Sequence, residues 1–476
     1  PEEALADPAF LADGCVAIVD DPEVGRIREV GSTLRLSAGA GPAPGPAPGI
    51  GEHTREILDE ARAATPATVA NTSRGALASP LEGIRVLDLG LAVAGPFGTQ
   101  VLSDLGADVI KINTPYDSFW HTNHIAMACN RGKRSLSLNL KDERGMEALL
   151  RLARDSDVVH HNMRDAAAQR LGVDFESLRA INPDLIYCHT RGFERGHRDG
   201  LPGNDQTAAA LAGVTWADGG CDDGGRPLWS LTSLGDFGNG FLSAIGVLQA
   251  LYHRDRTGEG CFVDTSIVYA CLLNTSYTWM TEAGEPGPRP HLDGDELGMS
   301  ATYRLYPTAD GWLCLAALTE DHWRSCAATL GLGDLITDPR FATVGARRDH
   351  DGDLRSRFVG AFVTCSAADW FAALDAAGVP CEISSDTVAL GVFDDPELIE
   401  RGWVVRYEQG IVGRLDQAGC LVDLSDTPGR IAGPPLVVGD SSREVLREVG
   451  YGDDAIDALV AAGVVIESEA ATGRAS

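Results

Sequence analysis

The sequence predicts an α/β fold: a large domain built on a doubly wound, mostly parallel, Rossmann-like sheet, with a smaller α+β domain inserted into it. Apolar stretches at 84–89 and 108–112 enclose a helical pattern at 97–105, which makes a strand–helix–strand unit and implies parallel strands. The same alternation continues from 146 to 190. Beyond about 280 it stops at a segment rich in Pro and Gly, where the smaller domain begins.

The elements of the large domain are predicted in order from these patterns. IRVLDL at 84–89 is short and mainly apolar, as a strand covered on both faces is. After the helix and the second strand, the pattern predicts a helix at 146–154, a strand at 158–160, a helix at 174–181 and a strand at 185–190. A sheet of this kind binds ligands beyond the carboxyl ends of its strands.

The smaller domain is predicted from a change of pattern. EAGEPGPRPHLDGDEL at 282–297 is an irregular crossing, because Pro and Gly interrupt helices and strands alike. A hairpin at 303–315 turns at Asp310-Gly311, and helical patterns follow at 321–330 and 367–377.

Composition and charge exclude several classes of partner. The 476 residues are 44% hydrophobic, and their formal net charge of −30 argues against nucleic acid or anionic membrane as a general partner. No apolar run reaches transmembrane length, and the N-terminus lacks a signal-peptide pattern. Eleven cysteines, from Cys15 to Cys420, contain no CxxC pair, which favours reduced thiols in the cytoplasm over a disulfide framework or a zinc site.

An internal repeat links the two ends of the chain. Residues 7–58 align without a gap on 395–446 at a constant offset of 388, with 17 identities in 52 positions. A period this long is not that of a solenoid. We therefore expect the opening of the chain to be the tail of an upstream copy of the domain that follows.

The repeat and the patterns together predict the domain boundaries. Residues 1–62 are expected to be the C-terminal remnant of the upstream copy. A linker is expected at 63–80, followed by the first part of the large domain at 81–284, the small domain at 285–380, and the return to the large domain with the C-terminal tail at 381–476.

One stretch organises the candidate site, LTSLGDFGNGFLSAIGVLQALY at 231–252. Asp236 follows a turn of small residues, and an apolar helix is expected to begin at Gly238 and Gly240. An Asp at a helix start accepts backbone N–H groups and answers the positive end of the helix dipole. The same placement keeps a carboxylate ionised in an apolar crevice, as a nucleophile requires, and the glycines leave amides bare for an oxyanion. From these residues alone, an N-cap and a nucleophile both stay open.

Six segments follow one another along the chain: LEGIRVLDLGLAVAGPFGTQVLSDLGADVIKI (81–112), NRGKRSLSLNLKDERG (130–145), NMRDAAAQRLGVDFESLRAINPDLIY (162–187), the Asp236 turn with its helix, RTGEGCFVDTSIVYA (256–270) and YPTADGWLCLA (306–316). In sequence and order they resemble the class III CoA-transferase family, the CaiB/BaiF type that includes formyl-CoA and carnitine CoA-transferases. The resemblance spans residues 81 to about 465.

The resemblance implies that Asp236 is a nucleophile in the transfer of CoA between carboxylic acids. It implies an acyl-aspartyl anhydride followed by an aspartyl-CoA thioester, with CoA as a substrate and no metal or permanently bound cofactor. Members of the family form interlocked dimers. We therefore expect either a homodimer or a pseudo-dimer with an upstream fused half.

The phosphates of CoA call for clustered Arg and Lys side chains. The segment NRGKRS is the densest basic cluster of the chain, and the resemblance adds an Asn and a basic residue from a second loop. The expected CoA-binding residues are Lys111, Arg131, Lys133, Arg134, Asn162, Arg164 and Arg170.

Asp205 is a possible secondary acid. In the racemase branch of the family the matching motif is Gly-His-Asp, whose acid helps to exchange the proton α to the thioester. Asn204 replaces that His here, which favours a structural or positioning role for Asp205. Val93 stands where the oxalate-using branch has Gln, so oxalate or formate specificity is not expected. Two alternatives stay open: an acyl-CoA racemase, isomerase or lyase with Asp205 or one of His160, His161 and His189 as its base, and a non-catalytic partner half.

Overall fold

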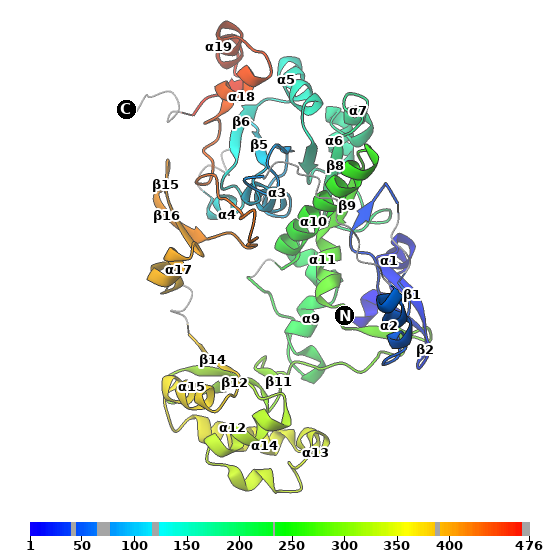
Figure 1. Cartoon of the computed structure of the whole chain (residues 1–476), viewed down its shortest axis with the longest axis vertical. Helices are drawn as coiled ribbons and strands as arrows, with labels where there is room; N and C mark the ends of the chain where they lie inside the picture. Colours follow the sequence, from blue (N-terminus) through cyan, green and yellow to red (C-terminus); the bar gives the residue numbers. More distant parts are fainter. Residues whose placement is uncertain (40–43, 64–76, 117–122, 232–233, 386–390, 469–476) are drawn as a thin grey trace. The chain divides into compact units, whose positions relative to one another are not determined.

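The computed structural model describes residues 1–39, 44–63, 77–116, 123–231, 234–385 and 391–468 (Figure 1). Two compact units are present. The large unit comprises residues 1–212, 231–287 and 401–476, and the small unit comprises 213–230 and 288–400. Most of the expected linker, residues 64–76, lies outside the described residues.

The core of the large unit is an eight-stranded sheet in the order β17-β6-β5-β4-β7-β8-β9-β3. Its six central strands are parallel, and the short edge strands β17 and β3 run antiparallel to them. The strands are β3 (Arg35–Leu36), β4 (Arg85–Asp88), β5 (Asp108–Asn113), β6 (Arg134–Leu138), β7 (Val158–His161), β8 (Ile186–Arg191), β9 (Phe262–Ser266) and β17 (Val465–Ile466). The predicted doubly wound, mostly parallel sheet is confirmed.

The strand order places a topological switch between β4 and β7. From β4 the chain proceeds outward to β5 and β6, and it then returns to β7 on the other side of β4 before continuing to β8 and β9. Ligands of doubly wound sheets bind beyond the carboxyl ends of the strands at such a switch. Asp88 and His161 end the two strands there.

Helices cover both faces of this sheet, which explains why its strands are apolar on both sides. On one face Val86 and Val158 pack with α3 (Ala94–Asp104) and α10 (Leu234–Thr257). On the other, Leu87 and Val159 pack with a second set of helices. This set consists of α5 (Glu143–Arg154), α6 (Asp165–Leu171), α7 (Phe175–Arg179), α18 (Ser442–Glu448) and α19 (Asp453–Ala461).

The large unit contains six further helical segments among the described residues. They are η1 (Glu2–Ala6), α1 (Pro8–Asp13), α2 (Thr54–Ala63), α4 (His124–Ala128), α8 (Asp205–Leu211) and α11 (Ile267–Asn274). Small sheets lie beside the main one: β1 (Val16–Asp21), β2 (Gly25–Val30) and β10 (Trp279–Thr281) form a three-stranded sheet, and β15 (Val404–Gln409) pairs with β16 (Gly413–Ala418).

The small unit is α+β, as predicted. Its antiparallel sheet consists of β11 (Gly298–Ser300), β12 (Tyr303–Pro307), β13 (Trp312–Ala316) and β14 (Cys381–Ser384), with the expected turn between Thr308 and Gly311. Tyr306, Trp323 and Phe358 are central to its core. The helical segments of this unit are α9 (Val214–Asp218), η2 (Cys221–Asp223), α12 (Glu320–Thr329), η3 (Gly333–Ile336), α13 (Val344–Asp349), α14 (Asp351–Phe362), α15 (Ala367–Ala376), η4 (Val392–Asp394) and α17 (Pro396–Glu400).

The bounds of the small unit differ from the expected 285–380. It includes residues 213–230, which the sequence patterns place in the large domain, and it extends to residue 400. The backbone of Gly220 lies so close to Asp293 that a Cβ at this glycine would be 2.1 Å from the Asp293 carbonyl oxygen. This association joins segments far apart in sequence, and local patterns carry no sign of it.

The two copies of the repeat fold into the same elements at the offset of 388. β1 and β2 at 16–21 and 25–30 correspond to β15 and β16 at 404–409 and 413–418. The helices α1 and α17, which begin at Pro8 and Pro396, also correspond. The opening of the chain is therefore an ordered part of the large unit, in which β3 pairs with β9 of the main sheet.

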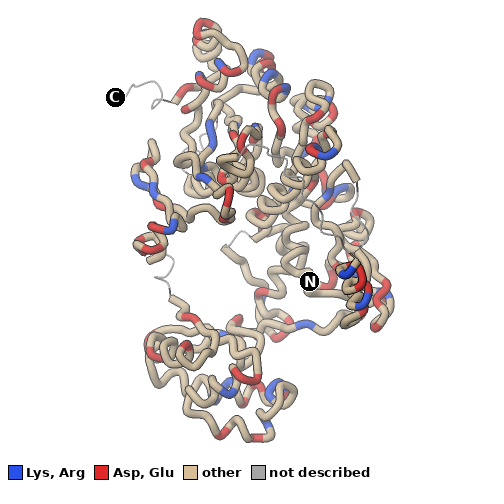
Figure 2. Tube along the Cα trace, viewed as in Figure 1, with Lys and Arg blue, Asp and Glu red and all other residues tan. Residues whose placement is uncertain are grey.

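Acidic positions are distributed over both units rather than collected in one segment (Figure 2). Across the described residues, no single helix has both the length and the apolarity needed to cross a membrane. The bent pair α14 and α15 meets that test only jointly, and its Leu354, Phe358 and Leu374 are buried in the core of the small unit.

Candidate active site

Asp236 lies in the first turn of α10, two residues after the helix begins at Leu234. The side chain is half-buried. Within the described part of the chain, its carboxylate has neither a hydrogen-bond nor an ion-pair partner. It is thus not occupied by capping its own helix, and the interpretation of Asp236 as a simple N-cap is wrong.

Asp205, on another helix, caps a backbone N–H group in the first turn of α10. It begins α8, and its Oδ1 accepts a hydrogen bond from the backbone N–H of Asp236 at 2.9 Å. Gly235 permits this approach, because a Cβ at that position would be 2.6 Å from the same oxygen. A glycine is therefore required before Asp236, because any side chain at position 235 would keep the Asp205 carboxylate from reaching the start of α10.

The two carboxylates shape each other's ionisation. Burial, followed by the nearby charge of Asp205, raises the pKa of Asp236 to about 7. Burial also raises the pKa of Asp205, against the backbone hydrogen bonds from Asp236 and Gly235. A carboxylate with a raised pKa is a stronger base and nucleophile when ionised, and Asp236 is partly ionised at neutral pH.

The glycines that follow Asp236 serve packing rather than an oxyanion. Gly238 and Gly240 lie inside α10, where their N–H groups belong to the helix. A Cβ on Gly240 would be 2.7 Å from the ring of Phe97 on α3, and one on Gly238 would be 2.9 Å from Ala270. The expectation that these glycines open the helix and leave amides bare is therefore wrong.

At the switch point, Asp88 is the centre of a buried charge cluster. Its carboxylate accepts hydrogen bonds from Lys111 at 3.2 Å, Lys133 at 2.8 Å, the Thr99 hydroxyl at 2.7 Å and the Gly90 N–H at 2.8 Å. Burial by itself would raise the pKa of Asp88, but the two lysines hold it well below its ordinary value. Burial lowers the pKa of Lys133 to about 8, against the attraction of Asp88.

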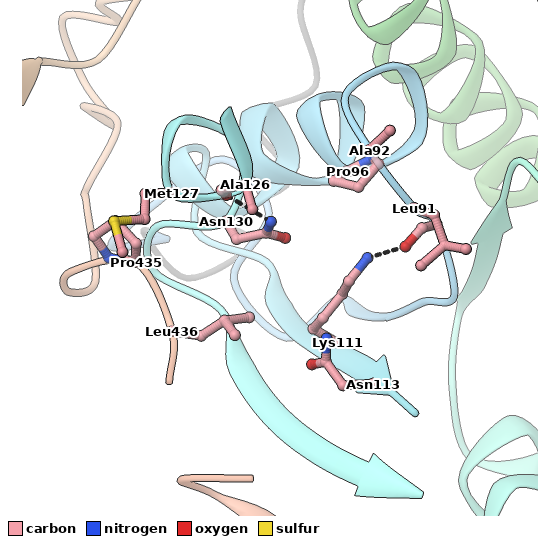
Figure 3. A pocket seen from close by; sticks show the side chains of 11 residues that line it. Leu91, Ala92, Pro96, Lys111, Asn113, Ala126, Met127, Asn130, Pro435 and Leu436 are labelled. Carbon is pink, nitrogen blue, oxygen red and sulfur yellow. Dashed lines mark hydrogen bonds between the residues drawn. The ribbon is translucent and has the colours of Figure 1, made fainter. Parts of the chain in front are cut away.

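A small cavity adjoins this cluster, with Lys111 at its edge (Figure 3). Its volume of about 20 Å³ holds about one water molecule. Ala92 in its wall has a φ of 61°, a conformation that costs a non-glycine residue energy and that concentrates at functional sites. The lining residues are Gly90, Leu91, Ala92, Pro96, Lys111, Asn113, Ala126, Met127, Asn130, Pro435 and Leu436.

The helix that carries Asp236 is tied to this cavity through α3. The ring of Phe237, the next residue, packs edge-on against Phe97, with ring centroids 4.6 Å apart. Phe97 follows Pro96 in the first turn of α3, and Pro96 lines the cavity. Burial raises the pKa of Cys129, which precedes the cavity-lining Asn130, and the charge of Asp236 contributes to that rise.

The expected CoA-binding residues divide into two groups. Four of them are committed to internal partners. Lys111 and Lys133 bind Asp88, while Arg131 binds Asp104 at 2.7 Å, and Arg134 binds Asp108 at 2.6 Å together with Glu448. The structure thus brings Lys111 and Lys133 together but directs Arg131 and Arg134 elsewhere, and the sequence cluster NRGKRS is not a single basic patch.

The second group lies after β7. Asn162 accepts a hydrogen bond from the Leu91 N–H at 2.8 Å and donates one to the Leu91 carbonyl at 2.7 Å, so it fixes the loop beside the cavity. Arg164 and Arg170, at the start and end of α6, are exposed. No described residue forms a hydrogen bond or ion pair with either guanidinium.

The three candidate histidines, His160, His161 and His189, are buried in the large unit. Burial lowers the pKa of His160 to about 4 and that of His161 well below its usual value, so both are neutral at pH 7. His161 stacks on His189, with centroids 4.4 Å apart, and the His189 Nε2 donates to the Met163 carbonyl at 2.7 Å. Among the described residues, no group of three or more His, Cys, Asp or Glu side chains is placed to hold a metal ion.

Sequence reasoning missed Asp88, Asn130 and Thr99. Asp88 ends an otherwise mainly apolar strand, and an acid in such a run was itself a signal, because a buried carboxylate needs partners. Thr99 donates to Asp88, and Asn130 accepts a hydrogen bond from Lys133 at 2.9 Å. Nothing in the sequence around either residue indicated these contacts.

Fold and site together define a doubly wound α/β protein with a half-buried aspartate at a helix N-terminus near the switch point. Residues 81–440 match the family model described as CoA-transferase family III, and the chain belongs to that family. It is 31% identical over 399 residues to the succinyl-CoA:mesaconate CoA-transferase of Haloarcula hispanica, with 78% of this chain and 97% of that protein covered.

Two further similarities support the family. The chain is 30% identical over 431 residues to the formyl-CoA:oxalate CoA-transferase of Escherichia coli O157:H7 (strain EC4115 / EHEC), with 80% of this chain and 99% of that protein covered. The crystal structure of a CAIB/BAIF family protein from Brucella suis superposes with a TM-score of 0.66 at 27% identity, covering 78% of this chain and 99% of that one.

Proposed function

We propose that this protein transfers CoA from an acyl-CoA donor to a carboxylic acid acceptor, with Asp236 as the nucleophile. The observation that carries the proposal is the free carboxylate of Asp236, whose helix start is capped by Asp205 instead. A nucleophile must keep its lone pairs available, and a pKa of about 7 combines reactivity with partial ionisation at neutral pH.

In the proposed mechanism the Asp236 carboxylate attacks the donor thioester carbonyl and CoA leaves as the thiolate, giving an acyl-aspartyl anhydride. The thiolate attacks the aspartyl carbonyl and releases the donor acid, giving an aspartyl-CoA thioester. The acceptor carboxylate then attacks that thioester, forming a second anhydride and freeing the thiolate. Attack of the thiolate on the acceptor carbonyl yields the new acyl-CoA and regenerates Asp236.

For CoA itself, we propose that Arg164 and Arg170 contact phosphate groups, since both are exposed and without partners in the described residues. Asn162 would hold the Leu91 loop against the ligand through its paired hydrogen bonds. Lys111 and Lys133 would support the site indirectly, by holding Asp88 and the backbone carbonyls of Gly90 and Pro96 in place.

The names of the relatives support a short dicarboxylic acid as the acceptor class, because mesaconate and oxalate are both short dicarboxylic acids. Val93 in place of the Gln of the oxalate-using branch argues against oxalate as the acceptor. Eleven unpaired cysteines support a reducing compartment such as the cytoplasm.

Trapping the intermediate tests the proposal. The protein is mixed with succinyl-CoA and hydroxylamine, digested, and analysed by mass spectrometry for a hydroxamate. We expect the hydroxamate on Asp236, its absence in Asp236→Asn, and a loss of about 10⁴-fold or more in kcat for that variant. A hydroxamate on another residue, or an Asp236→Asn variant with full activity, would overturn the assignment.

A parallel incubation distinguishes the racemase or lyase alternative. A 2-methylacyl-CoA in deuterated water, without an acceptor acid, is expected to retain its α-proton. No observation favours a proton-abstracting role for Asp205, whose Oδ1 is engaged by the backbone of α10.

A further inference from the structure

The turn between β7 and α6 carries Asn162 and Arg164, two residues proposed to support or contact CoA. It spans residues 162–164, because β7 ends at His161 and α6 begins at Asp165. Arg164 is the N-cap residue of α6, and its side chain makes no capping hydrogen bond. The position of Arg164 therefore depends on how the backbone is held on either side of it, at Met163 and Asp165.

A single buried side chain on the neighbouring strand holds both of these residues. His189 lies on β8, opposite His161 in the parallel register, and it is 2% exposed. Its Nε2 donates to the Met163 carbonyl at 2.7 Å, and its Nδ1 lies 3.1 Å from Oδ1 of Asp165. One imidazole thus joins the residue before Arg164 to the residue after it.

A second imidazole restrains the same turn. The His161 Nδ1 accepts a hydrogen bond from the Met163 N–H at 3.1 Å, and the His161 ring stacks on that of His189 with centroids 4.4 Å apart. Both backbone polar groups of Met163 are therefore bound by imidazole nitrogens. The His189 ring, stacked on one face and engaged at both nitrogens, has little freedom to rotate.

Asp165 is held a second time, by Arg191. Positions 189 and 191 alternate along β8, so their side chains leave the same face of the sheet. The Arg191 Nη1 donates to Oδ2 of Asp165 at 2.6 Å, while His189 faces Oδ1. The contact with His189, opposed by partial burial and aided by Arg191, holds the pKa of Asp165 well below its usual range. The carboxylate therefore stays ionised and keeps both side chains beside the start of α6.

The same face of β8 also reaches the other end of α6. The Tyr187 hydroxyl donates to the carbonyl of Val173 at 3.0 Å, just after the helix ends. Tyr187 thus fixes the end of α6, whereas His189 fixes its beginning, where Arg164 lies.

We propose that His189 is a positioning residue for CoA: by holding Met163 and Asp165, it fixes the start of α6 so that Arg164 meets a phosphate group of the ligand. This inference rests on the proposed function, in which Arg164 contacts phosphate. His189 itself touches neither CoA nor the reacting atoms. A backbone that is fixed in advance reduces the conformational freedom lost when Arg164 binds, and this strengthens binding without a new contact.

Calorimetric titration of the full chain with CoA and with pantetheine, which lacks every phosphate, tests the proposal. His189→Phe keeps an aromatic ring beside His161 but removes both ring nitrogens. It is expected to raise the Kd of CoA about tenfold, as the weakening of a charge-assisted hydrogen bond does, and to leave the Kd of pantetheine unchanged. His189→Gln, whose amide can replace the Nε2 donor to Met163 but not the contact with Asp165, should give an intermediate Kd for CoA.

Two comparisons separate positioning from general destabilisation. Ser156→Ala is the matched control, because it removes a buried hydroxyl that donates to the Leu152 carbonyl at 2.7 Å, before the amino end of β7 and away from the turn. It should leave the Kd of both ligands unchanged. Adding Arg164→Ala to His189→Phe should weaken CoA binding no further than Arg164→Ala does alone, because the imidazole acts through that arginine.

A His189→Phe chain that binds CoA as tightly as the wild type, or that loses affinity for CoA and pantetheine equally, would overturn the inference. Additive losses in the double variant would do the same. If His189→Phe does not fold, His189→Gln carries the test, and a wild-type Kd for CoA in that variant would overturn the inference. Wild-type protein that binds CoA no more tightly than pantetheine would instead refute the phosphate contact in the proposed function.

Discussion

Asp205 and Asp236 are chemically alike, and their surroundings give them different tasks. Asp205 accepts the N–H of Asp236 and so holds the start of α10. Asp236 has no such duty, and burial beside a like charge raises its pKa to about 7. Two neighbouring carboxylates whose environments separate their roles are a common arrangement in catalytic sites.

The first prediction concerns the charge of Asp205. Asp205→Asn keeps an oxygen that accepts the Asp236 N–H but removes the negative charge. The pKa of Asp236 is therefore expected to fall, and the acid limb of kcat/KM against pH should move to lower pH. Steady-state kinetics between pH 5 and 8 checks this.

Asp205→Ala provides the comparison, because it removes both the charge and the cap. It should cost about 1 kcal/mol of stability in addition to shifting the profile. An acid limb that stays in place in Asp205→Asn would show that the two carboxylates do not interact.

The second prediction concerns Asp88, which neutralises two buried lysines. Asp88→Asn leaves Lys111 and Lys133 without a counter-charge and is expected to lower the free energy of unfolding by about 3–5 kcal/mol. Urea denaturation followed by circular dichroism measures the loss. Asp155→Asn, at an exposed pair with Arg154, is the control and should change little. Equal stability of the two variants would contradict the role of Asp88.

The sequence pointed to Asp236 and Asp205 individually, but the contact between them and the surroundings of the cations were not predictable from it. Family resemblance located the Gly-Asp turn, whereas the cap from Asp205 joins residues 31 positions apart and needs the fold. NRGKRS reads as one basic cluster, yet alternate residues of a strand point to opposite faces. Lys133, immediately before β6, meets Asp88, whereas Arg134, the first residue of β6, meets Asp108 on the neighbouring strand.

Among the elements, the pair α3–α10 positions Asp236. The two helices approach closely because glycines lie between them: a Cβ on Gly98 would be 2.1 Å from the Ser243 hydroxyl and 2.8 Å from the Gly240 carbonyl. Gly98 therefore determines how near the start of α10, and with it Asp236, can lie to α3.

The third prediction follows from that contact. Gly98→Ala is expected to push α10 outward, destabilising the fold by about 1–3 kcal/mol and lowering kcat. Gly360→Ala in α14 is the matched control, because a Cβ there meets nothing within 4 Å. It should stabilise by about 0.5–1 kcal/mol through helix propensity. Thermal unfolding and steady-state kinetics of both variants check the contrast, and an unperturbed Gly98→Ala enzyme would contradict it.

Element positions were largely predictable where local periodicity is strong. The strand expected at 108–112 is observed as β5 at Asp108–Asn113, and the helix expected at 367–377 as α15 at Ala367–Ala376. The start of α10 was missed, because Leu234 and Gly235 are poor start signals and the cap comes from Asp205. Pairing partners such as β2 with β10 depend on contacts between distant segments and have no local signature.

For the whole molecule, folding changes the ionisation of groups in opposite directions. Asp236 is protonated in the folded chain up to a pKa of about 7, whereas an unfolded Asp is ionised above about 4. Folding therefore favours proton uptake by this group between those values, and its contribution to stability falls as pH rises through 7. His160, with its pKa lowered to about 4, and His161 behave in the opposite sense, because only the unfolded chain protonates them below about 6.5.

The fourth prediction is that these opposite pH dependences produce a maximum in the free energy of unfolding as a function of pH. The free energy of unfolding should rise as pH falls from about 7.5 to 6.5, where Asp236 takes up its proton, and decline below 6.5, where two buried histidines oppose one aspartate. Above about pH 7.5 the lowered pKa of Lys133, about 8, acts in the opposite sense. The upper limb should be shallower than about 1.4 kcal/mol per pH unit, the limit for one proton, because Asp236 is half-exposed and solvent screens its charge. Urea unfolding at a series of pH values measures the profile. In Asp236→Asn the upper limb should flatten while the lower limb persists, and a variant that keeps the full rise would assign it to another group.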